Sequence, residues 1–268
     1  MGFYQDSVDA LRGIFNKLEL IMEGKPAIYL SDPVWRTISA SLWDTDKDGF
    51  ITKEEASIGR LVRFDEFTDA DKIQILDISK LATRGLYSTS KLTGVKEVYL
   101  GIGLTAPPYQ GFMNNTSLEV LDIGPYILNT DRMLCKGATN LRKVILNNVI
   151  TRIDAQAFMN CTSLTEISDI PDTCTGIYGD YNNEVFRNCS SLKEIRIGSG
   201  ITKIGVWAFA GCTSMKSFYI KATTPPTMGD NCFTNNPCNI YVPRGSGDAY
   251  KAATNWSTYA DRIIEYDF

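Results

Sequence analysis

The residues best suited to chemistry lie in one acidic stretch, D-T-D-K-D-G-F-I-T-K-E-E, at positions 44–55. Three aspartates stand at alternate positions, a glycine follows them, and a glutamate closes the stretch. Carboxylate oxygens at this spacing suit a calcium ion, and the glycine permits the sharp bend that gathers them. A main-chain carbonyl and a threonine hydroxyl, or a bridging water, would complete the shell. The stretch therefore predicts a calcium site formed by Asp44, Asp46, Asp48, Phe50, Thr52 and Glu55.

This stretch resembles the EF-hand calcium loop, which lies between an entering and a leaving helix. Asp32-Pro33 is a suitable start for the entering helix, whose apolar face would comprise Val34, Trp35, Ile38 and Leu42. Thr52 and Glu55 form a capping-box pair for the leaving helix, which would carry Ile58, Leu61 and Val62. The alternative is a solvated acidic turn that binds no metal. Because no second such loop occurs, we expect a structural clamp rather than a calcium switch.

Composition excludes several classes of function. The chain has no histidine, so it contains neither a Ser-His-Asp nor a Cys-His catalytic arrangement, and no histidine-built zinc site. A formal charge of −4 and a pI near 5.1 argue against a nucleic-acid partner. No apolar run approaches the ~18 residues that span a bilayer, and no signal peptide is visible. We therefore expect a protein that is not an enzyme, binds no nucleic acid and has no transmembrane segment.

Most of the chain repeats one phrase, an apolar residue followed three and five residues later by two others. The successive openings are 22 or 23 residues apart, except for one interval of 28 that contains P-D-T-C-T-G-I-Y-G-D-Y-N-N, a predicted protruding loop. In one unit the last apolar position is Asp169. Such a period is typical of leucine-rich repeats, in which each unit adds one strand to a parallel sheet. The openings are Ile73, Val95, Leu118, Leu141, Leu164, Leu192 and Met215, and an eighth turn ends in Ile240 and Val242.

Cysteines recur at one register of the repeat. Cys161, Cys189 and Cys212 occupy the position that Asn115 and Ala138 hold in neighbouring turns. Small residues that replace one another predict a tight interior corner, where a thiol fills space and donates weakly to the backbone. Parallel side chains disfavour disulfides here, and no further ligands are present for a metal. Near the end of the chain, Cys232 and Cys238 are compatible with a disulfide or with two free thiols.

The phrase F-x-N-C-T/S-S-L-x-x-I-x-I, preceded by I-T-x-I-x-x-x-A-F, resembles the BspA-like leucine-rich repeat family, and I-Y-V-P-R-G-S-G-D-A-Y resembles its closing cap. The likeness covers residues 73–266. It implies an α/β repeat fold, a leucine-rich-repeat solenoid with a parallel sheet. It further implies an extracellular or cell-surface protein, often lipid-anchored once a signal segment is removed, that adheres to proteins or glycans on a host or another cell.

Three regions follow from these patterns. We expect a helical N-terminal region with the EF-hand-like loop at 1–66, the solenoid at 67–242 and a C-terminal cap at 243–268. Residues 6–23 have the spacing of an amphipathic helix, which would pack against the EF-hand helices. The tail is predicted to form short helices whose Tyr250, Trp256 and Tyr259 cover the open end of the sheet. We expect the chain to be a monomer.

Solvent-facing strand positions form the candidate ligand surface, because tyrosine and arginine are favoured at binding hot spots. The alternative is an ordinary mixed-charge surface on a non-binding spacer or an accessory module of a surface complex. An enzyme would need a paired-carboxylate cleft. Glu166 and Glu194 would lie about 5 Å apart on adjacent strands, but a flat sheet offers no cleft. The predicted surface comprises Glu97, Tyr99, Lys143, Asn147, Glu166, Glu194, Arg196, Tyr219, Lys221 and Tyr241.

Overall fold

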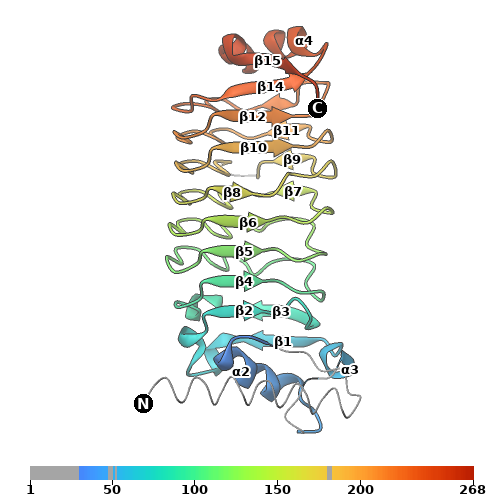
Figure 1. The fold of residues 1–268 in the computed structure, drawn as a ribbon, viewed down its shortest axis with the longest axis vertical. Helices are drawn as coiled ribbons and strands as arrows, with labels where there is room; N and C mark the ends of the chain where they lie inside the picture. Colours follow the sequence, from blue (N-terminus) through green and yellow to red (C-terminus); the bar gives the residue numbers. More distant parts are fainter. Residues whose placement is uncertain (1–29, 48–50, 52, 180–182) are drawn as a thin grey trace.

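The chain winds into an elongated stack of turns, each of which adds a strand to a long wall of parallel strands (Figure 1). The computed structural model describes residues 30–47, 51, 53–179 and 183–268. The predicted helix at 6–23 lies outside these residues. A family of strands on one side, and a second family of shorter strands on the other, enclose a single apolar core.

The first wall contains two hydrogen-bonded groups, in the order β2-β4-β5-β6-β8 and β10-β12-β14-β15. Its strands are β2 (Ile75–Asp77), β4 (Glu97–Tyr99), β5 (Val120–Asp122), β6 (Lys143–Ile145), β8 (Glu166–Ile167), β10 (Glu194–Ile197), β12 (Ser217–Ile220), β14 (Asn239–Pro243) and β15 (Ile263–Tyr266). The second wall has the order β13-β11-β9-β7, and β1 pairs with β3 near the N-terminal end. These strands are β1 (Arg60–Arg63), β3 (Thr83–Tyr87), β7 (Arg152–Ile153), β9 (Gly176–Ile177), β11 (Lys203–Ile204) and β13 (Thr227–Met228).

Helices are few and short. The α-helices are α2 (Pro33–Trp43), α3 (Lys53–Ala56) and α4 (Gly247–Ala252). Four 3₁₀ helices complete the described elements: η1 (Phe64–Glu66), η2 (Ala70–Lys72), η3 (Thr89–Lys91) and η4 (Trp256–Arg262).

Equivalent apolar residues stack in register along the first wall. Leu76 pairs with Val98, Val98 with Leu121, and Leu121 with Val144, and all four side chains are buried. A single turn cannot bury its own apolar face. The apolar faces are buried only when neighbouring turns stack on one another. The strand predicted for each of the eight repeat units is present, which confirms the repeat and its period.

At five junctions of the first wall, a turn is joined to the previous one by the same pair of main-chain hydrogen bonds. At the start of the strand, two consecutive N–H groups donate to one carbonyl of the preceding turn. The N–H groups of Glu119 and Val120 reach the Lys96 oxygen at 2.7 and 3.0 Å. The same arrangement joins Thr165 and Glu166 to Arg142. These bonds satisfy the backbone inside a tightly wound coil.

The cysteine register is a column of side-chain donors between turns. The Sγ atoms of Cys161, Cys189 and Cys212 lie 3.1–3.2 Å from main-chain oxygens of the preceding turn. Two asparagines in the same register donate equivalently, Asn115 to Leu92 O at 2.8 Å and Asn236 to Phe209 O at 3.0 Å. All seven cysteines are free and buried, so Cys232 and Cys238 form no disulfide. The predicted role of the thiols as interior fillers is confirmed.

The residue before each of these corners adopts a left-handed backbone conformation. The φ angles are positive at Asn114, Asn160 and Asn188 and at Gly137 and Gly211. Asparagine and glycine tolerate this region at the lowest cost among the amino acids. The asparagine of the repeated N-C pair is therefore a backbone requirement of the turn.

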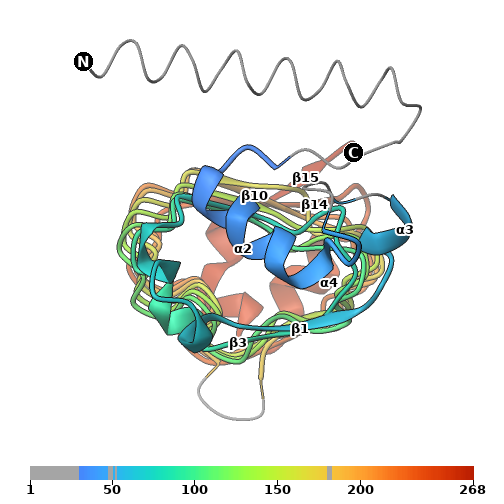
Figure 2. The same cartoon turned by 90° about the horizontal axis from the view of Figure 1, so that it is seen from below.

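Both ends of the solenoid are closed. Asp32 caps α2 by accepting from Trp35 N at 2.8 Å, and its other oxygen accepts from Gln74 N and Ile75 N at 2.8 and 3.0 Å. Those two N–H groups are the ones that would donate to a preceding turn, so a carboxylate replaces the missing carbonyl. The helix α2 crosses this end of the coil (Figure 2).

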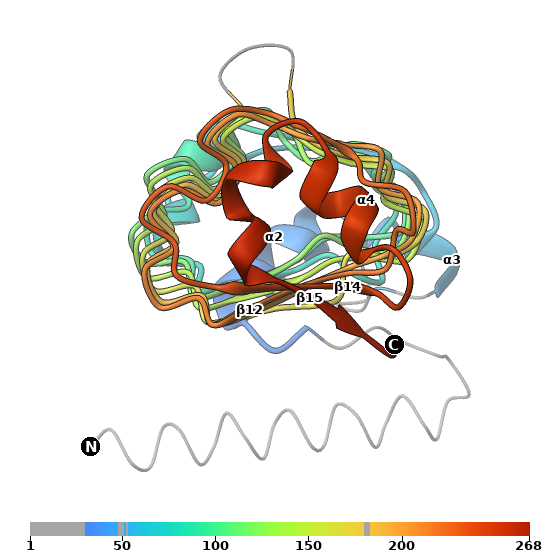
Figure 3. The same cartoon turned by 90° about the horizontal axis from the view of Figure 1, so that it is seen from above.

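At the other end, α4 and η4 cross the opening (Figure 3). Tyr250 and Trp256 are fully buried and donate to Ala222 O and Pro226 O, each at 2.8 Å. The Tyr259 hydroxyl accepts from Phe233 N. The tail covers this end of the coil but is not helical throughout, because it ends in strand β15, which pairs with β14.

Two further expectations were wrong. The helix that leaves the acidic loop is the single turn α3, and Leu61 and Val62 belong to strand β1 within the region expected to be helical. Pairing with β3 buries Val62 and satisfies the backbone of this segment. The insertion in the long interval is also partly a strand, because Gly176 and Ile177 form β9 in the second wall.

The buried thiols generate a pH prediction. Burial raises the pKa of Cys174 to about 11 and that of Cys212 to about 12. The pKa of a cysteine thiol in the unfolded chain is about 8.5. Above that pH the unfolded state therefore releases protons that the folded state retains. Stability should be fully present below about pH 8.5 and fall as the pH rises toward the folded values, by up to ~1.4 kcal/mol per pH unit for each thiol. Urea denaturation at a series of pH values measures this slope.

Cys212→Ala supplies the comparison, because Ala138 already fills the equivalent position in another turn. The variant should lose stability at neutral pH but show a shallower decline above pH ~8.5, since it lacks one titrating thiol. Ile195→Val, a core change without a titrating group, should keep the parent slope. Equal slopes for Cys212→Ala and the parent would contradict the buried, protonated state of this thiol.

Candidate functional site

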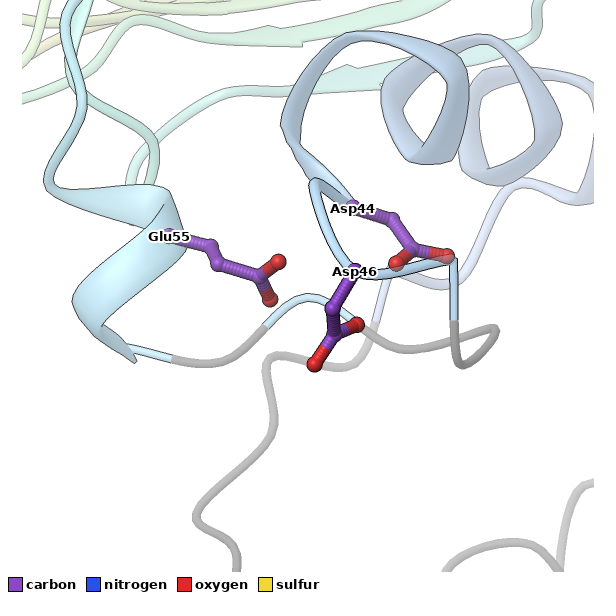
Figure 4. Close-up of side chains that lie close together, drawn as sticks. All are labelled: Asp44, Asp46 and Glu55. Carbon is purple, nitrogen blue, oxygen red and sulfur yellow. The ribbon is translucent and has the colours of Figure 1, made fainter.

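The acidic loop brings together three carboxylates from two helices. Asp44 follows the last residue of α2, Asp46 lies two residues on, and Glu55 projects from α3. Ligand oxygens of the three lie within 4.8 Å of one another (Figure 4). Glu55 is buried, and its Oε1 accepts from the N–H and Oγ of Thr45 at 2.7 and 2.8 Å.

Hard oxygen ligands converging at this separation match the donor set of a calcium ion. The structure thus brings together the first, second and last of the predicted ligands. Asp48, Phe50 and Thr52 lie outside the described residues. Ile51, the apolar residue of the loop, is buried.

Two tryptophans, Trp35 and Trp43, connect this loop to the solenoid through hydrogen bonds and ring contacts. The indole N–H of Trp43 donates to Ile58 O at 3.0 Å and so ties the end of α2 to the segment beyond α3. Trp35 donates to Asp77 O at the edge of β2, and its ring contacts those of Trp43 and Phe64. The acidic loop is therefore attached to the first turns of the repeat through buried aromatic packing.

The predicted ligand surface lies on the outer face of the first wall, with one exception. Nine of the ten residues lie on its strands or directly after one, and all are half-buried or exposed. Asn147 instead lies in the turn after β6. Its amide nitrogen donates to Gly124 O and Ile127 O, so it serves the turn. Burial and the neighbouring Glu97 carboxylate raise the pKa of Tyr99 to about 12.

Aromatic side chains gather on this face near the C-terminal end. We call Tyr219, Tyr241, Tyr266 and Phe268 the aromatic patch. The rings of Tyr219 and Tyr241 stack with centroids 4.6 Å apart, and Tyr266 meets both edge-on. Phe268 packs against Tyr266 at 5.2 Å, and the guanidinium of Arg196 lies 4.1 Å from the centre of the Tyr219 ring.

Tyr266 and Phe268 were missed by the sequence reasoning, which assigned the tail to helices. Their signal is the alternation of apolar and acidic residues in I-I-E-Y-D-F, which places Ile264, Tyr266 and Phe268 on one face of a strand. All three side chains are exposed, while Ile263 is buried.

The expected pairing of Glu166 with Glu194 across adjacent strands is wrong. β8 and β10 belong to separate hydrogen-bonded groups. Each glutamate is instead close to a basic side chain, Glu166 to Lys143 at 3.5 Å and Glu194 to Arg196 at 2.8 Å. Each of the two glutamates therefore belongs to a pair of opposite charge on the sheet face.

Comparison with known families decides the classification. A family model described as a BspA type leucine-rich repeat region matches in six copies, over residues 63–182 and 129–244. The chain belongs to this family. No curated protein matches the chain. Within the described residues, no helix of this BspA-type protein is long and apolar enough to cross a membrane.

Two solved structures show a distant likeness to this BspA-type protein. The pneumococcal vaccine antigen PcpA is 15% identical with a TM-score of 0.46, and the match covers 78% of this chain and 56% of that one. A leucine-rich repeat protein from Bacteroides ovatus is 12% identical with a TM-score of 0.26, over 78% and 84% of the two chains. This chain therefore spans about half the length of the PcpA structure. Both TM-scores are below 0.5, so the assignment depends on the family match.

Proposed function

We propose that this BspA-type protein is an extracellular or cell-surface module that binds a protein or glycan on a host or another cell. The observation that carries the proposal is the aromatic patch. Its four aromatic side chains lie beside Arg196 on the face of a rigid sheet, and Tyr266 and Phe268 are 39% and 48% exposed. Localisation at the surface is supported by the family, whose resemblance implies it.

Exposed aromatic clusters are unusual on a protein that binds nothing. Large apolar side chains on a soluble protein are commonly scattered, whereas contiguous ones mark interaction sites. Tyrosine and arginine are also the residues that contribute most to binding energy at interfaces. Because the patch stands on stacked strands, it is already held in place, and a ligand would not have to order it.

We further propose that the acidic loop binds calcium as a structural clamp. An ion held by Asp44, Asp46 and Glu55 would fix the end of α2 relative to α3, which leads directly into β1. It would also relieve the repulsion between three neighbouring carboxylates. The fixed helix α2 carries Asp32, the residue that closes the first edge of the sheet.

A second candidate function is that of a structural spacer. Ion pairs on the sheet face favour it, because Arg142–Glu119 and Lys143–Glu166 join neighbouring turns as in an ordinary solvated surface. Binding by the aromatic patch distinguishes the two functions.

Replacing Tyr241 and Tyr266 with alanine tests the binding function. The parent should bind at least one component of an array of extracellular-matrix proteins and glycans. Binding by the double variant should be weaker by about thirtyfold or more, since a single hot-spot aromatic contributes ~2 kcal/mol. Tyr126→Ala, which removes a tyrosine that is 56% exposed and outside the patch, should bind as the parent does. No binding across the array would favour the spacer, and full binding by the double variant would rule out the patch.

Thermal denaturation in calcium and in a chelator tests the clamp. Calcium at 100 times its dissociation constant should stabilise the protein by about 2.7 kcal/mol and raise the melting temperature. Glu55→Gln should abolish the shift, because it removes the closing bidentate ligand. Asp71→Asn, which neutralises an exposed acid outside the loop, should preserve it. A shift that survives in Glu55→Gln, or no shift in the parent, would contradict the site.

A further inference from the structure

The ladder of the first wall is open at one junction. Every other junction in the solenoid from β2 to β14 has a main-chain bond from the start of one strand to the preceding turn, such as Lys216 N to Lys193 O at 2.8 Å. Within the described residues, no such bond joins Lys193 or Glu194 to Thr165. The second wall stays paired across the same two turns, with Lys203 opposite Gly176. The opening is therefore confined to the first wall.

One extra residue accounts for the opening. The ladder resumes where Ile170 pairs with Ile197, and Ile170 N donates to Arg196 O at 2.9 Å. Ile167 and Ile195 occupy equivalent repeat positions. The chain therefore takes three residues from Ile167 to Ile170 but only two from Ile195 to Ile197. This is the geometry of a β-bulge, which disrupts pairing locally and redirects a side chain. Ile170 takes the buried position, and Asp169 lies exposed on the surface.

The bulge leaves main-chain groups directed into the opening. The N–H groups of Glu166 and Ser168 both donate to the turn that contains β6. The N–H and C=O groups of Ile167 point the opposite way along the strand, so they face β10. On β10, the oxygens of Lys193 and Ile197 both accept from β12, so the peptide groups of Glu194 face β8. A donor and an acceptor on each side thus face a gap where every other junction has a hydrogen bond.

An open depression of about 350 Å³ extends across β6, β8 and β10 and includes this gap. We call this depression the notch. Besides the main chain, its charged lining is formed by Lys143, Glu166, Asp169, Glu194 and Arg196. Asp169 also lines a second cavity of about 350 Å³ that extends toward Asp172 and Lys221. Small-molecule sites in proteins begin at ~300 Å³ and carry a few converging polar groups.

The chemistry of the notch favours a compact polyhydroxyl ligand. Three acids and two bases give the lining a charge of −1, which disfavours an anion. Both bases are already close to glutamates. An added peptide strand is excluded, because the two turns are joined at both ends of the gap, by Ser190 Oγ to Thr162 O and by Ile170 to Ile197. A sugar hydroxyl both donates and accepts, so it matches carboxylates, cations and free peptide groups together.

We infer that the notch between β8 and β10 binds a single uncharged sugar residue through Asp169, Glu194 and the open peptide groups of Ile167 and Glu194. This rests on the proposed function, since the sugar would be a terminal unit of a glycan that meets the sheet face. Its hydroxyls replace the main-chain bonds that the bulge prevents. The bulge at 168–169 is then a binding device in an otherwise regular repeat.

Amide chemical shifts measured with a panel of methyl glycosides at millimolar concentration test the notch. At least one glycoside should shift the Ile167 and Glu194 amide signals. Deletion of Asp169 restores the two-residue step between the last two apolar positions that the other repeat units have. β8 and β10 should then pair, and the amide shifts caused by the glycoside should vanish. Glu194→Gln, which preserves the shape of the site, should weaken binding about tenfold by removing a charged acceptor. Glu119→Gln, which changes a glutamate of the same wall outside the notch, should bind as the parent does.

Several outcomes would overturn the notch. These are no glycoside response at Ile167 and Glu194, a response that persists in both the deletion and Glu194→Gln, or a response to lysine amide in place of glycosides. Array binding without any glycoside response would overturn the notch and leave the proposed function intact. A glycoside response in a protein that binds nothing on the array would overturn the proposed function and leave the notch intact.

Discussion

The fold depends on a pair of main-chain hydrogen bonds that joins most strands of the first wall to one carbonyl of the turn before it. These bonds hold equivalent apolar residues such as Leu76 and Val98 in register, so that their side chains stack from turn to turn in the core. Corner side chains, whether cysteine or asparagine, extend the same rule by donating to the preceding turn. Where no preceding turn exists, the carboxylate of Asp32 accepts the two bonds instead.

The proposed functional sites lie where this regular bonding begins, ends or is interrupted. The acidic loop lies beside the first strand, attached through Trp35 and Trp43. The aromatic patch forms where β15 extends the sheet beyond the last repeat and adds Tyr266. The notch forms where one extra residue separates β8 from β10. In a repetitive scaffold equivalent positions share one environment, so local departures from the repeat are where distinct side-chain arrangements arise.

Much of the fold could be predicted from the sequence, because residues at equivalent positions of a repeat contact one another in neighbouring turns. The strands of the eight repeat units and the buried thiols follow from residue spacing, and the cap follows from the resemblance of the tail to the family's closing segment. The wrong expectations concern segments that occur once. Leu61 and Val62 suit a helix or a strand by pattern alone, and pairing with β3 decided between them. Asp169 was visible as an exception, but which neighbour would replace it in the core depended on packing against Ile197. Phe268 joins the aromatic patch through tertiary contacts with Tyr266 and Tyr219.

Amide hydrogen exchange at equivalent positions of the first wall tests the central claim most directly. The amides of Val120, Lys143, Glu166 and Ser217 each donate to the preceding turn. They should exchange slowly and with similar protection, since a single cooperative stack holds them. The Glu194 amide, which faces the notch, should exchange much faster. Protection at Glu194 equal to that of its four counterparts would contradict the account, as would fast exchange at all five.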